Sequence, residues 1–255
     1  MSEINRVGLL ASGDRATGQG GSTAEKIVRD TLDGTVTAFR IGVVICNNAK
    51  DTVGVYDKIE NVNDDFGLSR EDRIPVVNIS SRTHPGGPQG DGRTTFQESS
   101  AIYKELEEQG IDLVVLAGYM KILSGELITM RGWRRDHGWD DTLHNGIYHP
   151  GASIVNHHPA ILPFTAKTHG LGAHARALEL SKEGTIQHTA MTWHMVSAEV
   201  DSGPVIHEIP VAIEPGDSPQ SLGERVQAVE KEHASRVIER HLILRAEHLR
   251  GDSRS

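Results

Sequence analysis

Apolar runs rich in valine, isoleucine and leucine alternate along this chain with longer amphipathic stretches. Parallel strands covered by helices on both faces produce this alternation, because both sides of such a sheet are buried. The pattern predicts strands at residues 7–11, 39–46, 75–79, 113–117, 153–156, 189–196 and 205–213. It therefore predicts an α/β fold with a mostly parallel central sheet and helices on both of its faces.

Helices are predicted where apolar residues recur at helical spacing between start and stop signals. The predicted helices span residues 22–32, 94–109 and about 218–250. The first has Ser22 or Thr23 as its N-cap, the second stops at Gly110, and the third begins beside Pro219. We expect residues 251–255 to fray.

Three connections are long for a compact domain. They span residues 14–20, 82–93 and 125–151. Long segments without periodicity usually form lids or insertions. Because no Ser/Gly linker or internal repeat divides the chain, residues 1–255 are predicted to form a single domain, with an insertion at about 125–151.

The composition narrows the functional classes. A formal net charge of −9 disfavours a nucleic-acid partner, because binding to a phosphate backbone requires clustered Lys and Arg. No apolar run is long enough for a membrane span, and residues 7–11 are too short for a signal peptide. We therefore expect no membrane partner and a cytoplasmic location. Cys46 is the single cysteine, and its place at the end of an apolar strand indicates a small buried side chain.

Fourteen histidines raise the question of a metal site. Pairs such as His137 with His144 lack the helical i, i+4 spacing and the Cys/His clusters of zinc sites. We therefore expect no bound metal.

One segment places an amide and an imidazole together at the end of a predicted strand. Alternate side chains of a strand share a face, so Asn156 and His158 point the same way, and His157 is interpreted as structural. Pro159 should then end the strand. A single histidine is often only a satisfied polar residue, but the turn at Asp201 adds a carboxylate. An amide beside an imidazole that a carboxylate keeps cationic can stabilise an oxyanion, which predicts acyl transfer without a covalent intermediate.

Two further segments are suited to binding. Gly20 and Gly21 precede Ser22 and Thr23 at a helix start, where backbone N–H groups can cradle a phosphate. The alternative is a flexible connection without a ligand. Residues 116–123 follow a central strand, where their apolar side chains either line a slot for a flat ring or belong to the ordinary core.

Taken in order, these pieces resemble a known family. The chain carries Gly-Ser-Thr at 21–23, Leu-Ala-Gly-Tyr-Met-Lys-Ile-Leu-Ser at 116–124, Asn-x-His-Pro-Ala-x-Leu-Pro at 156–163, Asp-Ser-Gly-Pro-Val-Ile at 201–206 and Arg-Val-Gln at 225–227. This ordered set resembles the phosphoribosylglycinamide formyltransferases over about residues 7–242. The resemblance implies a Rossmann-like formyltransferase fold, with a nucleotide-phosphate half at about 1–117 and a catalytic and folate half at about 118–250.

The resemblance also implies a reaction and its residues. A formyl group would pass from 10-formyltetrahydrofolate, the co-substrate, to the amine of glycinamide ribonucleotide in purine synthesis. Asn156 and protonated His158 would donate to the oxyanion, while Asp201 keeps His158 cationic. The positions that match ribonucleotide contacts are Gly21, Ser22, Thr23, Pro159, Gln227 and Glu230, with His174 as a further candidate. Those that match folate contacts are Arg93, Tyr119, Met120, Lys121, Ile122, Leu123, His194, Val196, Ala198, Glu199 and Val200.

The chain departs from the family pattern in two places. Residues 14–19 separate the first strand from the glycines of the phosphate loop, which is usually compact. A larger insertion precedes Asn156, and it would cap the folate slot, cover a sheet edge or form the contact of a homodimer. The sequence leaves these three roles open.

Other functions use similar motifs. Methionyl-tRNA formyltransferase carries an added carboxyl-terminal barrel, and the acidic charge disfavours a tRNA partner. Formyltetrahydrofolate hydrolase typically has a regulatory domain in front, for which we expect no room before Val7. A sugar-amine formyltransferase remains an alternative. A non-enzymatic folate- or nucleotide-binding protein would have no need of a paired carboxylate and imidazole.

Overall fold

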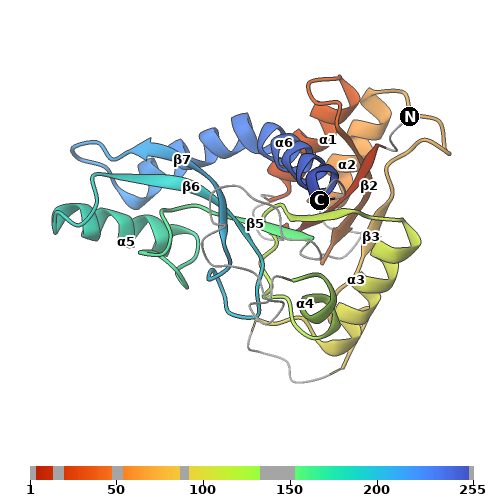
Figure 1. Ribbon diagram of the computed structural model, residues 1–255, viewed down its shortest axis with the longest axis horizontal. Helices are drawn as coiled ribbons and strands as arrows, with labels where there is room; N and C mark the ends of the chain where they lie inside the picture. The colour runs from red at the N-terminus through yellow and green to blue at the C-terminus, as the bar shows by residue number, and fades with distance from the viewer. Residues whose placement is uncertain (1–3, 14–19, 48–53, 87–91, 133–152, 253–255) are drawn as a thin grey trace.

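The computed structural model describes residues 4–13, 20–47, 54–86, 92–132 and 153–252. Within these ranges seven strands form one sheet in the order β3-β2-β1-β4-β5-β6-β7 (Figure 1). The strands are β1 Asn5–Ala11, β2 Phe39–Cys46, β3 Val76–Asn78, β4 Leu113–Leu116, β5 Ile154–His158, β6 His188–Met195 and β7 Val205–Ala212. Neighbours from β3 to β5 are parallel, whereas β6 is antiparallel to β5 and to β7. The predicted α/β fold with a mostly parallel sheet is confirmed.

Helices cover both faces of this sheet (Figure 1). The helices within the described ranges are α1 Ser22–Leu32, α2 Val55–Asp65, α3 Phe96–Glu108, α4 Glu126–Arg131, α5 Leu171–Lys182 and α6 Pro219–Asp252. Consecutive strand residues point to opposite faces, so Leu9 packs in a core with residues of α1, α2 and α6. Leu10 packs in a second core with residues of α3 and α4. Both leucines are fully buried, which explains the continuous apolar runs of the central strands.

The start signals of the helices explain which were predicted. Thr95 opens α3 with a capping box, and Ser218 accepts a hydrogen bond from Ser221 N at the start of α6. The N-cap of α1 is Gly21 rather than Ser22 or Thr23, so that expectation is wrong. Helices α2, α4 and α5 were not predicted. Like α1 they begin after a glycine that gives no side-chain hydrogen bond, but no Ser or Thr directly follows that glycine, as Ser22 and Thr23 follow Gly21.

Two predicted boundaries also need correction. The connection at 125–151 begins with helix α4 instead of irregular chain, and the remainder of that insertion from residue 133 lies outside the described residues. Helix α6 continues to Asp252, past the predicted end near residue 250. Of the expected connections at 14–20 and 82–93, residues 14–19 and 87–91 also lie outside the described residues.

The carboxyl end of β5 is extended by its antiparallel neighbour. The predicted strand at 153–156 is too short at this end, because β6 pairs with β5 through His158, and Pro159 then follows the strand as expected. The register places Asn156 opposite His194 and, on the other side, Leu116 of β4. The segment after β4 and the end of β5 therefore meet at one edge of the sheet.

Helix α6 connects the two ends of the sheet. Leu222 and Val226, near its start, pack with α5, β6 and β7. Ile238 and Leu242, further along, pack in the core that contains β1 and β2. In the described part of the chain, no helix combines the length and the apolar character that crossing a membrane requires.

Candidate functional site

A cavity of about 1030 Å³ lies where β4 and β5 end. Its walls come from the segment after β4, the end of β5, the turn after β6, the segment that leads into α5, and the start of α6. Ligands of open α/β sheets collect at the carboxyl ends of strands, and this volume suits a small organic ligand. Asn156, His158 and Asp201, the three residues predicted to act together, all line this cavity.

The amide of Asn156 is oriented by His194. Nδ1 of His194 lies 2.9 Å from the carbonyl oxygen of Met195, which only accepts hydrogen bonds, so Nδ1 carries the proton. Nε2 of His194 therefore accepts from Nδ2 of Asn156, at 3.3 Å. Burial lowers the pKa of His194, which favours this neutral form. One N–H of Asn156 is thus bound, and the second can donate to a ligand.

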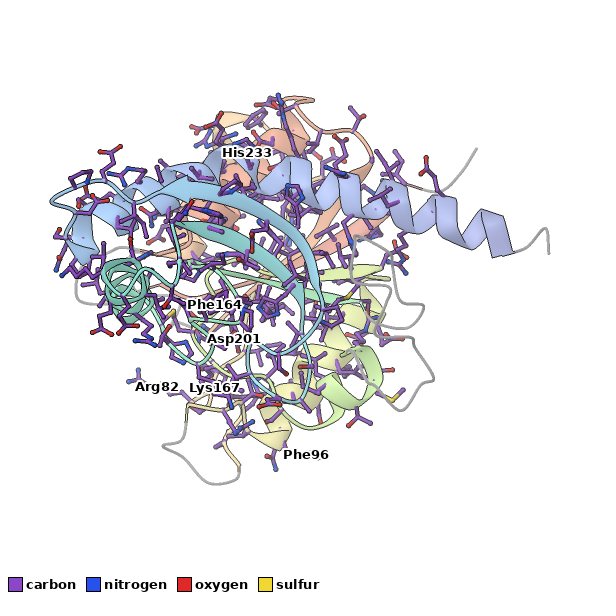
Figure 2. The ribbon with its side chains drawn as sticks, turned by 60° about the vertical axis from the view of Figure 1, so that its left-hand side comes forward. Arg82, Phe96, Phe164, Lys167, Asp201 and His233 are labelled. Carbon is purple, nitrogen blue, oxygen red and sulfur yellow. The ribbon has the colours of Figure 1, made fainter. Side chains whose placement is uncertain are left out.

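The carboxylate of Asp201 lies between two imidazoles. Its Oδ2 is 3.6 Å from Nδ1 of His158, and its Oδ1 is 3.7 Å from Nε2 of His194. The backbone N–H of Lys167 donates to Oδ2 at 3.0 Å, and Figure 2 shows these two residues side by side. Asp201 has a left-handed backbone, with a φ of 54°, which is a strained conformation of the kind that clusters at functional sites. The structure thus brings together His158 and Asp201, which are far apart in the sequence.

Burial opposes the cationic form expected for the ring of His158. His158 is only 3% exposed, and burial lowers its pKa to about 4. The negative charge of Asp201 raises this pKa, but it does not offset the burial, and His194 and His169 add to the lowering. The lowered pKa favours the neutral ring. The other ring nitrogen, Nε2, lies 3.1 Å from Oγ1 of Thr165.

His174 occupies a further part of the cavity wall. Its ring is buried, which lowers its pKa, and Nδ1 has no hydrogen-bond partner among the described residues. A Cβ at position 223 would lie 2.9 Å from the ring, so Gly223 of α6 leaves the space that His174 occupies. His174 was a candidate from the sequence, whereas the need for a glycine at position 223 was not predicted.

Comparisons with known proteins agree with this geometry. The family model described as Formyl transferase matches residues 145–238. Phosphoribosylglycinamide formyltransferase of Escherichia coli is 31% identical over 191 residues, covering 74% of this chain and 72% of that protein. The human trifunctional purine biosynthetic protein adenosine-3 is 31% identical over 88% of this chain, which spans only 17% of the human protein. The structure of phosphoribosylglycinamide formyltransferase from Bacillus halodurans superposes with a TM-score of 0.63 at 25% identity, covering 94% of this chain and 95% of that one.

The chain belongs to the formyl transferase family. The Escherichia coli relative shows this, because it is 31% identical and the match covers more than two thirds of its length. The resemblance stated from the motifs is therefore confirmed at the level of the family.

Most positions expected to contact the folate of a formyl transferase line the cavity. They are Tyr119, Met120, Lys121, Ile122, Leu123, His194, Val196, Glu199 and Val200. Arg93 and Ala198 do not line it; Arg93 is exposed and bridges to Ile122 at the cavity wall. Tyr119 and Leu123 also belong to the hydrophobic core, whereas Met120 is 72% exposed. The sequence left open whether this segment lines a ligand slot or belongs to the core, and different residues of the segment do each.

The ammonium group of Lys121 is paired with a carboxylate of the protein. Its Nζ lies 2.5 Å from Oε1 of Glu98, a fully buried carboxylate whose other oxygen accepts from Thr95 N in the capping box of α3. A buried charge must be paired, so this contact fixes the segment after β4 to α3. The ammonium group of Lys121 therefore has a structural partner, which the sequence motif did not indicate.

The positions expected to contact the ribonucleotide divide into two groups. Pro159, Gln227 and Glu230 line the cavity, whereas Gly21, Ser22 and Thr23 do not. Thr23 nevertheless donates a hydrogen bond from its hydroxyl to Oε1 of Glu230, which joins the start of α1 to the cavity wall.

The glycine loop before α1 has two supports that the sequence did not predict. Gly21 has a φ of 71°, and a Cβ there would lie 2.8 Å from Val55, so this position requires glycine. Nζ of Lys58 on α2 donates to the carbonyl oxygen of Gly20 at 2.7 Å and brings a positive charge to the loop. Both contacts come from α2, a helix that the sequence analysis missed.

The position of His157 differs from what the sequence indicated. It was interpreted as a structural residue pointing away from the site, but it lines the cavity. Its Nε2 lies 3.4 Å from Oε1 of Glu230, and its ring is 5.2 Å from that of Trp193. Strand alternation correctly separated His157 from Asn156 and His158, but it could not show that α6 brings Glu230 to the opposite face.

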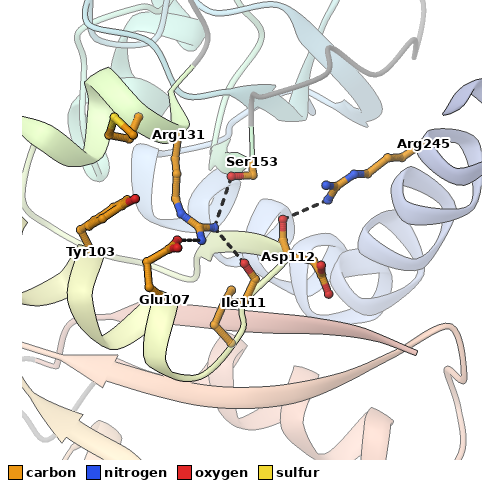
Figure 3. A pocket seen from close by; sticks show the side chains of 8 residues that line it. Tyr103, Glu107, Ile111, Asp112, Arg131, Ser153 and Arg245 are labelled. Atoms are coloured by element: carbon orange, nitrogen blue, oxygen red, sulfur yellow. Dashed lines mark hydrogen bonds and ion pairs between the residues drawn. The ribbon is translucent and has the colours of Figure 1, made fainter. Parts of the chain in front are cut away.

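A second, smaller cavity of about 300 Å³ lies between α3, α4 and α6 (Figure 3). Its arginines are already bonded: Arg131 donates to the Ile111 carbonyl and pairs with Glu107, and Arg245 donates to the Asp112 carbonyl. These contacts join α4 and α6 to the end of α3 and the residues that follow it. The described residues also contain no group of three or more His, Cys, Asp or Glu side chains arranged to hold a metal, and the absence of a metal stays a prediction.

Proposed function

We propose that this formyl transferase transfers a formyl group from 10-formyltetrahydrofolate to the amine of glycinamide ribonucleotide. The observation that carries the proposal is the convergence of Asn156, His158 and Asp201 on one cavity. The acceptor follows from the relatives of Escherichia coli and Bacillus halodurans, which are named as phosphoribosylglycinamide formyltransferases. The donor follows from the family resemblance of the segment after β4.

The proposed reaction begins when the amine attacks the formyl carbon and its lone pair forms the new C–N bond. The carbonyl π electrons move to the oxygen, where the second N–H of Asn156 stabilises the negative charge. His158, which is neutral, accepts a proton from the attacking amine, and Asp201 stabilises the imidazolium that results. This role replaces the cationic donor that the sequence analysis expected.

The intermediate then collapses without a covalent bond to the protein. The oxyanion reforms the carbonyl, the bond between the formyl carbon and the folate nitrogen breaks, and that nitrogen keeps the electron pair. His158 returns its proton to the departing nitrogen, so the ring is neutral again for the next cycle. The products are the formylated ribonucleotide and tetrahydrofolate.

The two ends of the cavity suit the two substrates. Tyr119, Ile122 and Val196 offer an apolar wall for a flat pterin ring. At the other end, Glu230 is a buried acceptor for a hydroxyl group, and it is joined through Thr23 to the start of α1. The backbone N–H groups of α1 and the charge of Lys58 favour a phosphate beyond it.

The proposal is tested by mixing the purified protein with both substrates and with each one alone. Deformylated folate, followed by its absorbance, should form only when glycinamide ribonucleotide and 10-formyltetrahydrofolate are both present. Release of formate without the amine would identify a hydrolase instead. Transfer to an amino-sugar nucleotide, with none to glycinamide ribonucleotide, would identify a sugar-amine formyltransferase.

A near-isosteric variant provides the control. Asn156→Asp keeps the size of the side chain but replaces the N–H donor with a negative charge beside the developing oxyanion. Its rate should fall by about two to three powers of ten, the usual loss for one oxyanion donor. Transfer at the full rate by this variant would show that Asn156 does not stabilise the oxyanion.

A further inference from the structure

A histidine at the unspecified position of the Asn-x-His-Pro motif lies beside the carboxylate of Glu230. His157 belongs to β5, and strand alternation turns its side chain away from Asn156 and His158. Its side chain is only 7% exposed, and neither ring nitrogen makes a hydrogen bond to the described residues. A buried polar group without a hydrogen bond is costly, which makes this ring a candidate for a role at the site.

The ring of His157 has a rigid neighbour. Trp193 of β6 is its cross-strand partner, and the two ring centroids lie 5.2 Å apart. Trp193 is itself buried, in the core that contains residues of α6. The ring is therefore supported from β6, while its Nε2 lies 3.4 Å from Oε1 of Glu230 on α6.

The carboxylate of Glu230 decides what the ring presents to it. A carboxylate oxygen only accepts hydrogen bonds, so it repels a nitrogen lone pair and attracts an N–H group. Nε2 of His157 therefore carries a hydrogen, which is true of the cationic ring and of one neutral form. At 3.4 Å the attraction is mainly that between the charge of the carboxylate and the N–H dipole.

Both donors beside Glu230 contact the same carboxylate oxygen. The hydroxyl of Thr23 donates to Oε1, and Oε1 is also the oxygen next to Nε2 of His157. Among the described residues, none donates a hydrogen bond to Oε2. Because Glu230 lines the cavity, Oε2 is the oxygen that a ligand there can use.

We propose that His157 is a positioning residue that, with Thr23, holds Oε1 of Glu230 and leaves Oε2 to accept a hydrogen bond from a hydroxyl group of the substrate ribose. The proposal rests on the proposed function for the identity of the substrate. Two donors on one oxygen restrict the rotation of the carboxylate, so the other oxygen keeps one position. A sugar without that hydroxyl leaves a buried acceptor unpaired, so His157 contributes to the preference for ribose over deoxyribose.

The preference is measured by the KM of glycinamide ribonucleotide and of its counterparts that lack the 2- or the 3-hydroxyl of the ribose. For the wild type, removal of the hydroxyl that binds Oε2 should raise KM by about tenfold or more. His157→Leu should raise KM for the ribonucleotide by roughly a few-fold, and change kcat and the KM of that deoxy counterpart little. An equal rise in KM for all three compounds, or no rise for the ribonucleotide, would overturn the proposal.

Two amide variants separate the contact of Nε2 from packing. The amide nitrogen of His157→Gln can reach the place of Nε2, whereas that of His157→Asn reaches only the place of Nδ1. The glutamine variant should therefore restore the preference for the hydroxyl, and the asparagine variant should behave like the leucine variant. Melting temperatures show that the variants are folded. A folded glutamine variant with no more preference than the leucine variant would contradict the assigned contact.

The other donor provides a second test of the same arrangement. Thr23→Val keeps the shape of the side chain and removes the hydroxyl that donates to Oε1. It should reduce the preference for the ribose hydroxyl, as His157→Leu does. If the His157 variants do not fold, this variant decides, and an unchanged preference would count against the proposal.

Binding of sugar phosphates separates this proposal from the proposed function. Ribose 5-phosphate and its 2- and 3-deoxy counterparts are titrated by NMR without a formyl donor, and equal binding of all three by the wild type would also overturn the proposal. If His157→Leu weakens the preference but no formyl group reaches glycinamide ribonucleotide, the proposed function fails and the role of His157 stands. If transfer occurs but His157→Leu leaves the preference unchanged, the role of His157 is wrong and the proposed function stands.

Discussion

The two ends of the cavity hold their polar groups in different ways. At the end formed by β5 and β6, Asn156, His158 and His194 are bonded to one another, to the backbone or to Thr165. At the end formed by α6, the carboxylate of Glu230 accepts from Thr23, while the nearby His157 makes no hydrogen bond to the described residues. Groups fixed by the protein suit bond-making steps, and groups with remaining capacity suit ligand binding. We therefore expect substitutions at the first end to change kcat and those at the second to change KM.

The largest effect should come from His158→Ala. Removing the group that accepts and returns the proton should lower kcat by about two to four powers of ten and change KM for glycinamide ribonucleotide little. Steady-state kinetics measure both constants. The matched control is His188→Ala, because His188 is exposed at the start of β6 and does not line the cavity. A His158 variant with normal kcat and a raised KM would show that this end, like the α6 end, acts in binding and not in the bond-making steps.

The protonation of His158 sharpens the same comparison. The NMR titration of its ring should have a midpoint near the pKa of about 4 that burial produces, compared with the ordinary value of 6.5. Asp201→Asn should lower this pKa further, because the carboxylate charge raises it. A midpoint near the ordinary value would mean that the ring is charged under mildly acidic conditions and would support the cationic role instead.

The lowered pKa of His158 also determines how the free energy of unfolding changes with pH. Between pH 6.5 and about 4, the unfolded chain binds a proton at His158 that the folded chain does not bind. The free energy of unfolding should therefore fall as the pH decreases through this window. The buried His241, whose pKa is also lowered to about 4, adds to the same trend. His158→Gln should reduce the slope in a thermal denaturation series, and an unchanged slope would contradict the assignment.

A smaller effect is expected from Glu230→Gln at the α6 end. The amide keeps an oxygen for Thr23 but loses the charge, and a hydrogen bond to a charged group is worth about 1.5–3 kcal/mol. KM for the ribonucleotide should rise by about tenfold or more, and kcat should stay close to that of the wild type. Glu232→Gln, an exposed neighbour on α6, is the control. A fall in kcat as large as that of His158→Ala would show that this end also takes part in the chemistry.

The smallest effect should follow His157→Leu. The variant keeps an apolar contact to Trp193 and removes the ring nitrogen that lies 3.4 Å from Glu230. The loss of one neutral polar interaction, about 0.5–1.5 kcal/mol, predicts a rise of a few-fold in KM for the ribonucleotide. Unchanged kinetics would return His157 to the structural role that the sequence first indicated.

The sequence predicted the strands better than the helices, for a physical reason. A buried strand is recognised by its continuous apolar run. One example is Phe39–Cys46, whose bounds were predicted correctly. A short helix is recognised mainly by polar residues at its start. Helices α2 and α5 begin after Gly54 and Gly170, and no Ser or Thr directly follows either glycine. The contacts that these helices supply to the site, such as Lys58 on α2, were missed with them.

The site residues could be named from the sequence, but their protonation could not. Ordered motifs predicted that Asn156, His158 and Asp201 converge, and all three line one cavity. The pKa of His158 depends on how completely the fold removes water from the ring, which no spacing reveals. The contact of its Nε2 with Oγ1 of Thr165 comes from a segment without periodicity or motif. Motifs identify groups, whereas packing decides the state in which they act.

The central claim is most directly tested by following the formyl carbon itself. The protein is supplied with 10-formyltetrahydrofolate labelled with ¹³C in the formyl group, together with glycinamide ribonucleotide, and the label is located by NMR. The account predicts that the label appears in the formamide of the ribonucleotide at a rate that His158→Ala reduces by about two to four powers of ten. Label found in formate, or transfer that His158→Ala leaves unchanged, would contradict it.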